Sequence, residues 1–123
     1  MTWPGWDHQL LGALGLEPTR ERRRFLTAWA RAEGGNARYN PLNTTMSVPG
    51  ALDYNSVHVK HYPDQMAGIA ATLLTLRLAY YRALVDALRE TALGADQILH
   101  RGALGVRTWG TSTQLIGEIL KHG

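Results

Sequence analysis

The chain has 123 residues, of which 45% are hydrophobic and 19% charged, and its formal net charge is +3. This length and hydrophobicity suffice for one domain with one core, and they exclude intrinsic disorder. The sequence has no cysteine, which excludes disulfides, thiol nucleophiles and cysteine-bound metals. No apolar run reaches the roughly 18 residues of a membrane-spanning helix, so we expect no membrane span. A net charge of +3 is too small to indicate nucleic-acid binding.

Two helices are predicted at the start of a single domain, which we expect to span residues 1–123. Apolar residues recur at three- and four-residue steps over residues 6–14, and Gly15 follows as a stop signal. A second helix is expected to begin at residues 17–19, where a proline suits the first helical turn. It runs to Glu33, where two glycines end it.

Residues 34–63 interrupt the helical pattern with glycine, proline and asparagine, which break helices and build turns. Short β-prone pieces remain at residues 43–48 and 54–60, separated by Pro49 and Gly50. These features predict a small irregular β-lobe. Because mostly loop-like insertions of about thirty residues are uncommon in small domains, we expect this lobe to carry a functional surface.

A long helix is predicted after the lobe, over residues 65–89. Asp64 is placed to cap its start. Its apolar side chains point nearly all the way round, which predicts the central, buried helix of the fold. We expect a break near residues 79–80.

Two shorter helices are predicted next, over residues 95–103 and 112–121. A glycine-rich turn over residues 105–110 is expected to join them. The predicted fold class is therefore mainly α (α+β), with a central buried helix and a small irregular β-lobe.

Glu33 is the residue that stands out. At about 100° per residue it falls within the apolar arc of its helix, in line with Trp29 and Phe25. Partial desolvation and the negative end of the helix dipole both favour the neutral carboxylic acid, which a glycosidase needs to protonate a leaving oxygen. The two following glycines would leave a cleft beside it. The alternative is a glutamate that faces solvent or pairs with Arg31 or Arg38.

Several stretches resemble the lysozyme-like peptidoglycan hydrolases, first AWARAEGG at residues 28–35 and NPLNTT at residues 40–45. VKHYPD at residues 59–64, leading into GIAA at residues 68–71, is similar to the Tyr-(Asp/Ser) entry to the central helix of the glucosaminidase branch. Phage endolysins and virion-associated lysins carry a similar succession of acid-Gly, Asn-Pro-Leu-Asn and Tyr-Asn. The resemblance covers about residues 20–90 and rests on the spacing of several loose elements.

The resemblance implies a lysozyme-like fold in which a helix ends at the catalytic glutamate, here Glu33, before a polar β-lobe. A retaining glycosidase needs a second carboxylate about 5 Å away, and an inverting one places it roughly 6.5 to 9.5 Å away. Asp53 is the only acid between Glu33 and Asp64. It is either this second carboxylate or a turn residue. In the resembled families the second acid is sometimes absent, which favours transglycosylation or a substrate-assisted route through the sugar's N-acetyl group.

Polar side chains of the predicted lobe are candidate ligands for sugar hydroxyls and N-acetyl groups, because they offer donors and acceptors on positionable side chains. These candidates are Asn43, Thr44, Thr45, Tyr54 and Asn55. The alternative for each is a turn-stabilising role. Tyr81 is a further candidate: it either faces the cleft near Glu33, as the resemblance implies, or packs in the core. His58 and His61 are not expected to bind metal, because residues three apart on a strand point to opposite faces.

We therefore expect an enzyme that cleaves the β-1,4 glycan strand of peptidoglycan, as a muramidase, glucosaminidase or lytic transglycosylase. Glu33 is its expected general acid, and no cofactor, metal or nucleic acid is expected. The resemblance implies phage-mediated lysis of the bacterial wall. The absence of a signal-peptide pattern fits a protein held in the host cytoplasm until release, or one carried on the virion. The rival interpretations are a non-catalytic glycan-binding or phage tail protein with this fold, and a basic DNA-binding helical protein.

Overall fold

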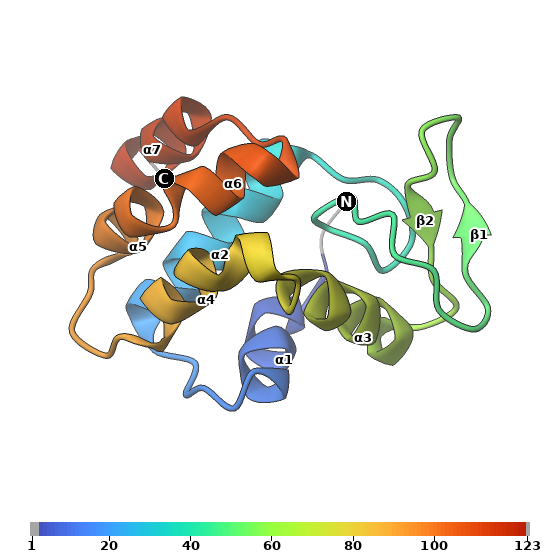
Figure 1. Cartoon of the computed structure of the whole chain (residues 1–123), viewed down its shortest axis with the longest axis horizontal. Helices are drawn as coiled ribbons and strands as arrows, with labels where there is room; N and C mark the ends of the chain where they lie inside the picture. The colour runs from blue at the N-terminus through green and yellow to red at the C-terminus, as the bar shows by residue number, and fades with distance from the viewer. Residues whose placement is uncertain (1–2, 123) are drawn as a thin grey trace.

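The computed structural model describes residues 3–122, and within them the mainly helical α+β class is confirmed (Figure 1). This part of the chain forms seven α-helices, one 3₁₀ helix and one two-stranded antiparallel sheet. In chain order the elements are α1 (Trp6–Ala13), α2 (Arg20–Glu33), β1 (Leu52–Asp53), β2 (Lys60–His61), α3 (Gln65–Leu76), η1 (Ala79–Tyr81), α4 (Arg82–Arg89), α5 (Ala95–Arg101), α6 (Ala103–Trp109) and α7 (Thr113–His122). The helices between residues 3 and 122 are all too short or too polar to cross a bilayer.

The elements separate into a helical part and a lobe. Helices α2 and α4 to α7 gather at one end of the molecule, and the small sheet with its loops lies at the other (Figure 1). Helices α1 and α3 pack against each other between them. Helix α2 packs against α5 and α7 within the helical part and also against α1, so the core is built around α2.

Local signals set both ends of α2. At its start, Thr19 lies in extended backbone and its hydroxyl accepts the N–H of Arg22 at 3.3 Å, which is a helix N-cap. At its end, Gly34 takes a left-handed φ of 60°, which glycine adopts without strain. The buried apolar side chains between them are Phe25, Leu26, Ala28 and Trp29. The helix therefore ends at Glu33, as expected.

Arg22 is the exception on the arginine-rich side of α2, because it is buried, with 4% of its surface exposed. Its guanidinium group donates to three main-chain carbonyls: Leu88 O at 2.7 Å, Glu17 O at 3.0 Å and Arg89 O at 3.1 Å. Two of these carbonyls belong to the last residues of α4. The charge therefore caps the carboxyl end of α4, where the helix dipole is negative, and ties α4 to α2.

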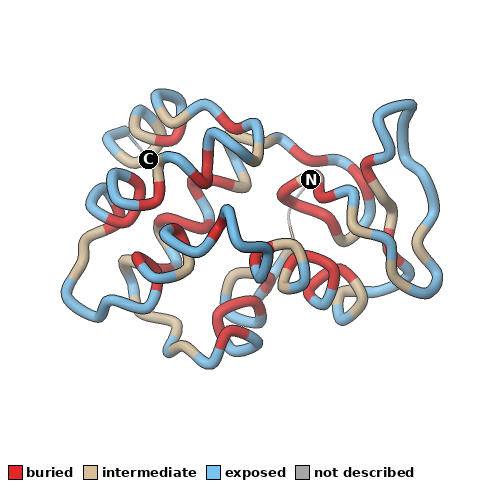
Figure 2. The backbone as a smooth tube through the Cα atoms, viewed as in Figure 1, coloured by how far each residue is buried: buried red, intermediate tan, exposed pale blue. Residues whose placement is uncertain are grey.

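The segment expected as one helix over residues 65–89 is divided, and its burial is one-sided. The break near residues 79–80 is confirmed, because Leu78 is extended and η1 and α4 follow it. The expectation of burial all round is wrong for α3, since Met66 is 80% exposed and Leu74 is 43% exposed. Helix α3 lies at the border of the two parts, packed on α1, and its outer face remains in solvent (Figure 2).

The β-lobe contains little sheet. The expected strand at residues 43–48 is a loop. Of the strand expected at residues 54–60, only Lys60 belongs to a strand, as the first residue of β2, and the rest forms the turn of the hairpin. In place of further β-sheet hydrogen bonds, the fully buried side chain of Asn40 holds the lobe together. Its amide group donates to the main-chain oxygens of Thr44 and Lys60 at 2.8 Å each, and its carbonyl accepts the Thr44 N–H at 2.9 Å. One side chain therefore joins the loop after α2 to β2.

The glycine-rich turn expected over residues 105–110 is wrong: most of it forms α6. A Cβ atom at Gly102 would lie 2.5 Å from Leu84 Cδ1, and one at Gly105 would lie 3.1 Å from Leu84 Cβ. These two glycines therefore allow α6 to pack closely on α4. Gly110 has a left-handed φ of 106° and ends the helix.

Candidate active site

The carboxyl group of Glu33 is held by two neutral side chains. Its Oε2 accepts the hydroxyl hydrogen of Thr111 at 2.6 Å, and its Oε1 accepts an amide hydrogen of Asn43 at 3.1 Å. The glutamate is half-buried. Its carboxyl plane is thus fixed by partners from two separate parts of the chain, the loop after α2 and the turn between α6 and α7.

Asn43 reaches Glu33 through a tight loop. Its backbone is left-handed, with φ of 57°, a conformation that asparagine tolerates better than most residues. Its Nδ2 also donates to the main-chain oxygen of Glu33 at 3.2 Å. Because a carbonyl oxygen can only accept, this contact settles which end of the Asn43 amide faces Glu33. Asn43, expected as a sugar ligand, is therefore a partner of the expected acid.

Gly35 makes this close approach possible. A Cβ atom at this position would lie 2.7 Å from the main-chain oxygen of Pro41 and 3.1 Å from Oδ1 of Asn43. Any larger residue would therefore push the loop away from the end of α2.

Thr111 is the functional candidate that sequence reasoning missed. It is 5% exposed, and its hydroxyl oxygen accepts the indole N–H of Trp29 at 2.8 Å. It lies 78 residues from Glu33 in the sequence and belongs to no motif. Only the docking of the last helices onto α2 brings it to the acid, so no local signal could have identified it.

A chain of aromatic rings lies behind this cluster. Trp29 packs edge-on against Trp109 at 5.0 Å between ring centres, and Trp109 packs against Tyr81 at 5.1 Å. The indole N–H of Trp109 donates to the main-chain oxygen of Leu42 at 2.7 Å, next to Asn43. Tyr81 is 6% exposed, and this burial raises its pKa. Of its two expected roles, the structure shows core packing.

Glu33 forms no ion pair with a lysine, arginine or histidine in residues 3–122. The alternative in which it pairs with Arg31 or Arg38 is therefore wrong within this range. The side-chain partners that orient its carboxyl group are therefore neutral donors.

Asp53, expected as the second carboxylate, is engaged elsewhere. It is exposed, bonds to Lys60, and lies 3.4 Å from Nδ1 of His58. The hydrogen bonds from Lys60 and then His58 lower the pKa of Asp53. β1 lies at the outer edge of the lobe, away from the end of α2 (Figure 1). The structure does not bring Asp53 to Glu33, because its hairpin projects into solvent.

The other expected sugar ligands are dispersed. Thr44 is buried, and its hydroxyl bonds to that of Thr75 at 2.9 Å, so its role is structural. Asn55 accepts two main-chain N–H groups of its own hairpin, which makes it a turn residue. Tyr54 packs edge-on against the ring of His61 at 4.9 Å. Thr45 is exposed in the loop that carries Asn43. The structure does not place these residues together around Glu33.

Two hollows, of about 440 and 560 Å³, follow the outer side of α2. The residues that line both are Asp7, Arg23, Thr27 and Arg31. The larger one also reaches Gly34 and Gly35, where a cleft was expected. Glu33 is not among its lining residues, since its carboxyl group is bound to the loop and to the turn after α6.

The residues from 3 to 122 contain no group of three histidine, aspartate or glutamate side chains that could hold a metal ion. No protein-family model, no curated protein and no solved structure matches the chain.

Proposed function

We propose that this protein cleaves β-1,4 glycosidic bonds in the glycan strands of peptidoglycan, with Glu33 as the general acid. The observation that carries the proposal is the fixed carboxyl group at the end of α2, with each oxygen held by a different neutral donor. The resemblance of residues 20–90 to lysozyme-like hydrolases supports the substrate class and a role in phage-mediated lysis of the cell wall.

In the proposed step, the carboxylic acid of Glu33 gives its proton to the glycosidic oxygen. The bond between C1 and this oxygen breaks, its electron pair stays with the oxygen, and the leaving sugar departs as an alcohol. A water molecule or a hydroxyl group of the same sugar then bonds to C1. Its proton passes to the Glu33 carboxylate, which restores the acid.

The position of Asp53 bears on the route. Asp53, the residue expected to be the second carboxylate, is bonded to Lys60 on a hairpin at the outer edge of the lobe, away from Glu33 (Figure 1). This arrangement favours a mechanism in which the substrate itself stabilises the positive charge at C1, through the oxygen of its N-acetyl group. Transglycosylation and substrate-assisted hydrolysis both fit this description.

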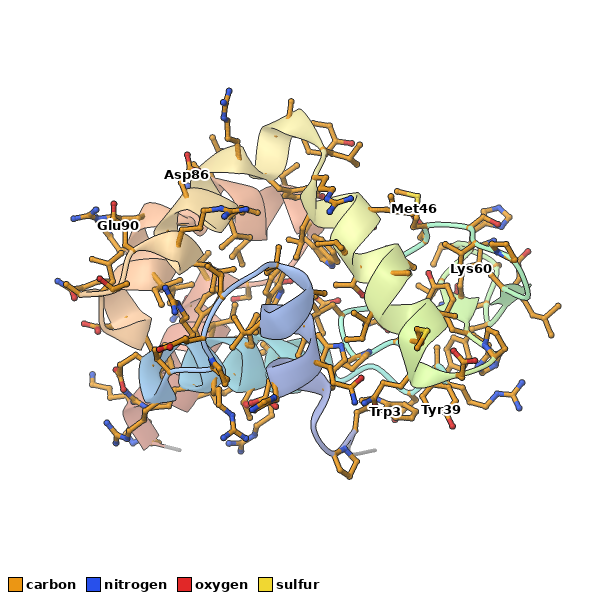
Figure 3. The ribbon with its side chains drawn as sticks, turned by 90° about the horizontal axis from the view of Figure 1, so that it is seen from below. Trp3, Tyr39, Met46, Lys60, Asp86 and Glu90 are labelled. Atoms are coloured by element: carbon orange, nitrogen blue, oxygen red, sulfur yellow. The ribbon has the colours of Figure 1, made fainter. Side chains whose placement is uncertain are left out.

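Replacement of Glu33 tests the proposal. Glu33→Gln keeps the shape of the side chain but removes its titrating proton, so we expect release of soluble fragments from purified peptidoglycan to fall about 100-fold or more. Glu90→Gln makes the same chemical change on an exposed residue far from the site and is the matched control (Figure 3). Mass spectrometry of the fragments then distinguishes reducing ends from anhydro ends. Equal release by wild type and Glu33→Gln would contradict the assignment.

Binding of the wild-type protein to peptidoglycan without any release would instead favour a non-catalytic glycan-binding protein. The structure gives little support to DNA binding, because the arginines in the first half of α2 are already engaged. Arg23 pairs with Asp7 at 2.9 Å, and Arg24 pairs with Glu21 at 2.8 Å.

A further inference from the structure

The hydrogen bonds around Thr111 have a fixed direction. An indole N–H can only donate, so Trp29 must be the donor to the Thr111 oxygen, at 2.8 Å. The hydroxyl group of a threonine has one hydrogen. This hydrogen points to Oε2 of Glu33, 2.6 Å away. The order Trp29, Thr111, Glu33 is therefore a one-way chain of donors that ends on the acid.

The two oxygens of Glu33 are consequently unequal. Oε2 accepts the short bond from Thr111 at 2.6 Å. Oε1 accepts a longer bond of 3.1 Å, from an Asn43 amide that also donates to the main-chain oxygen of Glu33. Of two carboxyl oxygens, the one that accepts the weaker hydrogen bond binds the proton more readily. The proton of the acid therefore belongs on Oε1.

We propose that Thr111, polarised by Trp29, is a positioning residue that holds Oε2 and leaves Oε1 to carry the transferred proton. This inference rests on the proposed function of Glu33 and deepens it. It assigns a role to a residue on the turn between α6 and α7, which the resemblance over residues 20–90 does not include.

The charged groups around the site do not provide this positioning. The titratable side chains close in sequence to Glu33, Asn43 or Thr111 are Arg31, Arg38, Tyr39 and Arg107, and Tyr81 packs against Trp109. Glu118, Lys121 and His122 lie in the second half of α7, where the main-chain oxygen of Leu120 accepts from Arg24 in the first half of α2. Within residues 3–122, no cationic group of this set pairs with Glu33, and Glu118 pairs with His122 on α7.

Kinetics on soluble, uncrosslinked glycan strands test the proposal. Thr111→Val removes the hydroxyl group and keeps the volume, so we expect kcat to fall on the order of tenfold while KM changes little. Thr111→Ser keeps the hydroxyl and should retain most of the activity. Thr108→Val, which removes an exposed hydroxyl bonded to Leu104 O within α6, is the matched control. Thr111→Ala removes the same hydroxyl and carries the test if the valine variant does not fold.

A second readout does not require activity. Because Thr111 donates to the ionised carboxyl group, its loss favours the protonated form. In ¹³C NMR titrations, the carboxyl signal of Glu33 should therefore change at a higher pH in Thr111→Val than in the wild type, and should be restored in Thr111→Ser.

The outcomes separate the two claims. If Glu33→Gln is inactive while Thr111→Val keeps the wild-type kcat and the wild-type titration curve, the role of Thr111 is overturned and the acid stands. If the wild-type protein releases nothing from peptidoglycan, the proposed function fails, and an unshifted titration curve in Thr111→Val would then overturn the positioning role as well. A kcat loss that Thr111→Ser does not rescue also overturns it, because the cause is then packing.

Discussion

The positive charge of Arg22 is buried, and its guanidinium group donates hydrogen bonds to main-chain oxygens. Its three acceptors include the carbonyls of Leu88 and Arg89, at the carboxyl end of α4. Carbonyls in a last helical turn have no partner within their own helix. Arg22 supplies one from α2, so its charge is stabilised by the negative end of a helix dipole.

Replacing Arg22 should therefore cost more than replacing a surface arginine. Arg22→Met keeps the length of the side chain but leaves buried carbonyls unpaired, and we expect the free energy of unfolding to fall by at least ~2 kcal/mol. Arg23→Met is the matched control: Arg23 is half-exposed and paired with Asp7, so its loss should cost under about 1 kcal/mol. Urea unfolding of both variants measures the difference. If both variants lose the same free energy of unfolding, the buried contacts of Arg22 stabilise the fold no more than a surface arginine does.

At the scale of elements, a side chain from one helix can cap the end of another. The start of α5 follows Gly94, which has no side chain to act as a cap. Glu21 of α2 fills this place, since its Oε1 accepts the N–H of Ala95 at 3.1 Å. The hydrogen bond from Ala95 is the largest cause of a lowered pKa at Glu21, and the charge of Arg24 acts in the same direction.

This lowered pKa predicts how stability depends on pH. A carboxyl group with a pKa below its usual value of 4.5 stabilises the folded state above that pH, and loses this contribution as the pH falls through its folded-state pKa. We therefore expect the Tm of the wild type to fall more steeply than that of Glu21→Gln below about pH 4.5. Glu17→Gln, on an exposed residue before α2, is the control. Parallel curves for wild type and Glu21→Gln in thermal melts would rule out this linkage.

At the scale of the whole molecule, Gly68 allows α3 to pack directly against the loop that follows α2. A Cβ atom on Gly68 would lie 2.0 Å from the main-chain oxygen of Tyr39. Gly68→Ala should therefore separate α3 from this loop and lower the free energy of unfolding by about 2 to 3 kcal/mol. Gly12→Ala on α1, where a Cβ would meet no atom within 4 Å, should be neutral or stabilising. Guanidinium unfolding measures the free energy of unfolding of both variants. If Gly68→Ala is as stable as the wild type, α3 and the loop can separate at little cost and the prediction is wrong.

Periodicity predicted the helices whose faces differ in polarity. α1, α2 and α7 begin and end close to their expected residues, and Glu33 closes α2 as expected. The prediction was wrong where one residue type can play two structural roles. Glycine breaks helices and therefore predicts a turn at Gly105, yet here Gly105 lies within α6 and allows it to pack on Leu84. Tertiary packing decided its role, and packing is not visible in a local window.

The site was predictable only in the part that is local in sequence. Asn43 follows Glu33 by ten residues and was among the expected site residues, although for a different task. Asp53 lies near in sequence as well, but its hairpin leads it away from the acid. Thr111 depends on a contact over 78 residues, for which one sequence holds no signal. Short-range patterns therefore predicted Glu33 as the candidate acid but not the residues that orient its carboxyl group.

The dependence of Glu33 on Thr111 has a consequence for heat and for local fluctuations. The turn that carries Thr111 is secured by α7, whose only fully buried residue among those described is Ile116. Helix α7 packs along α2 and α5, and Ile119 and Leu120 add partly buried contacts to those of Ile116. Because α2 also carries Glu33, the packing of α7 on α2 holds both the acid and its threonine partner in place. If Glu33 is the acid, a loosening of this helix pair on heating disarms the chemistry, so the packing of α7 on α2 sets the temperature range in which the protein can work.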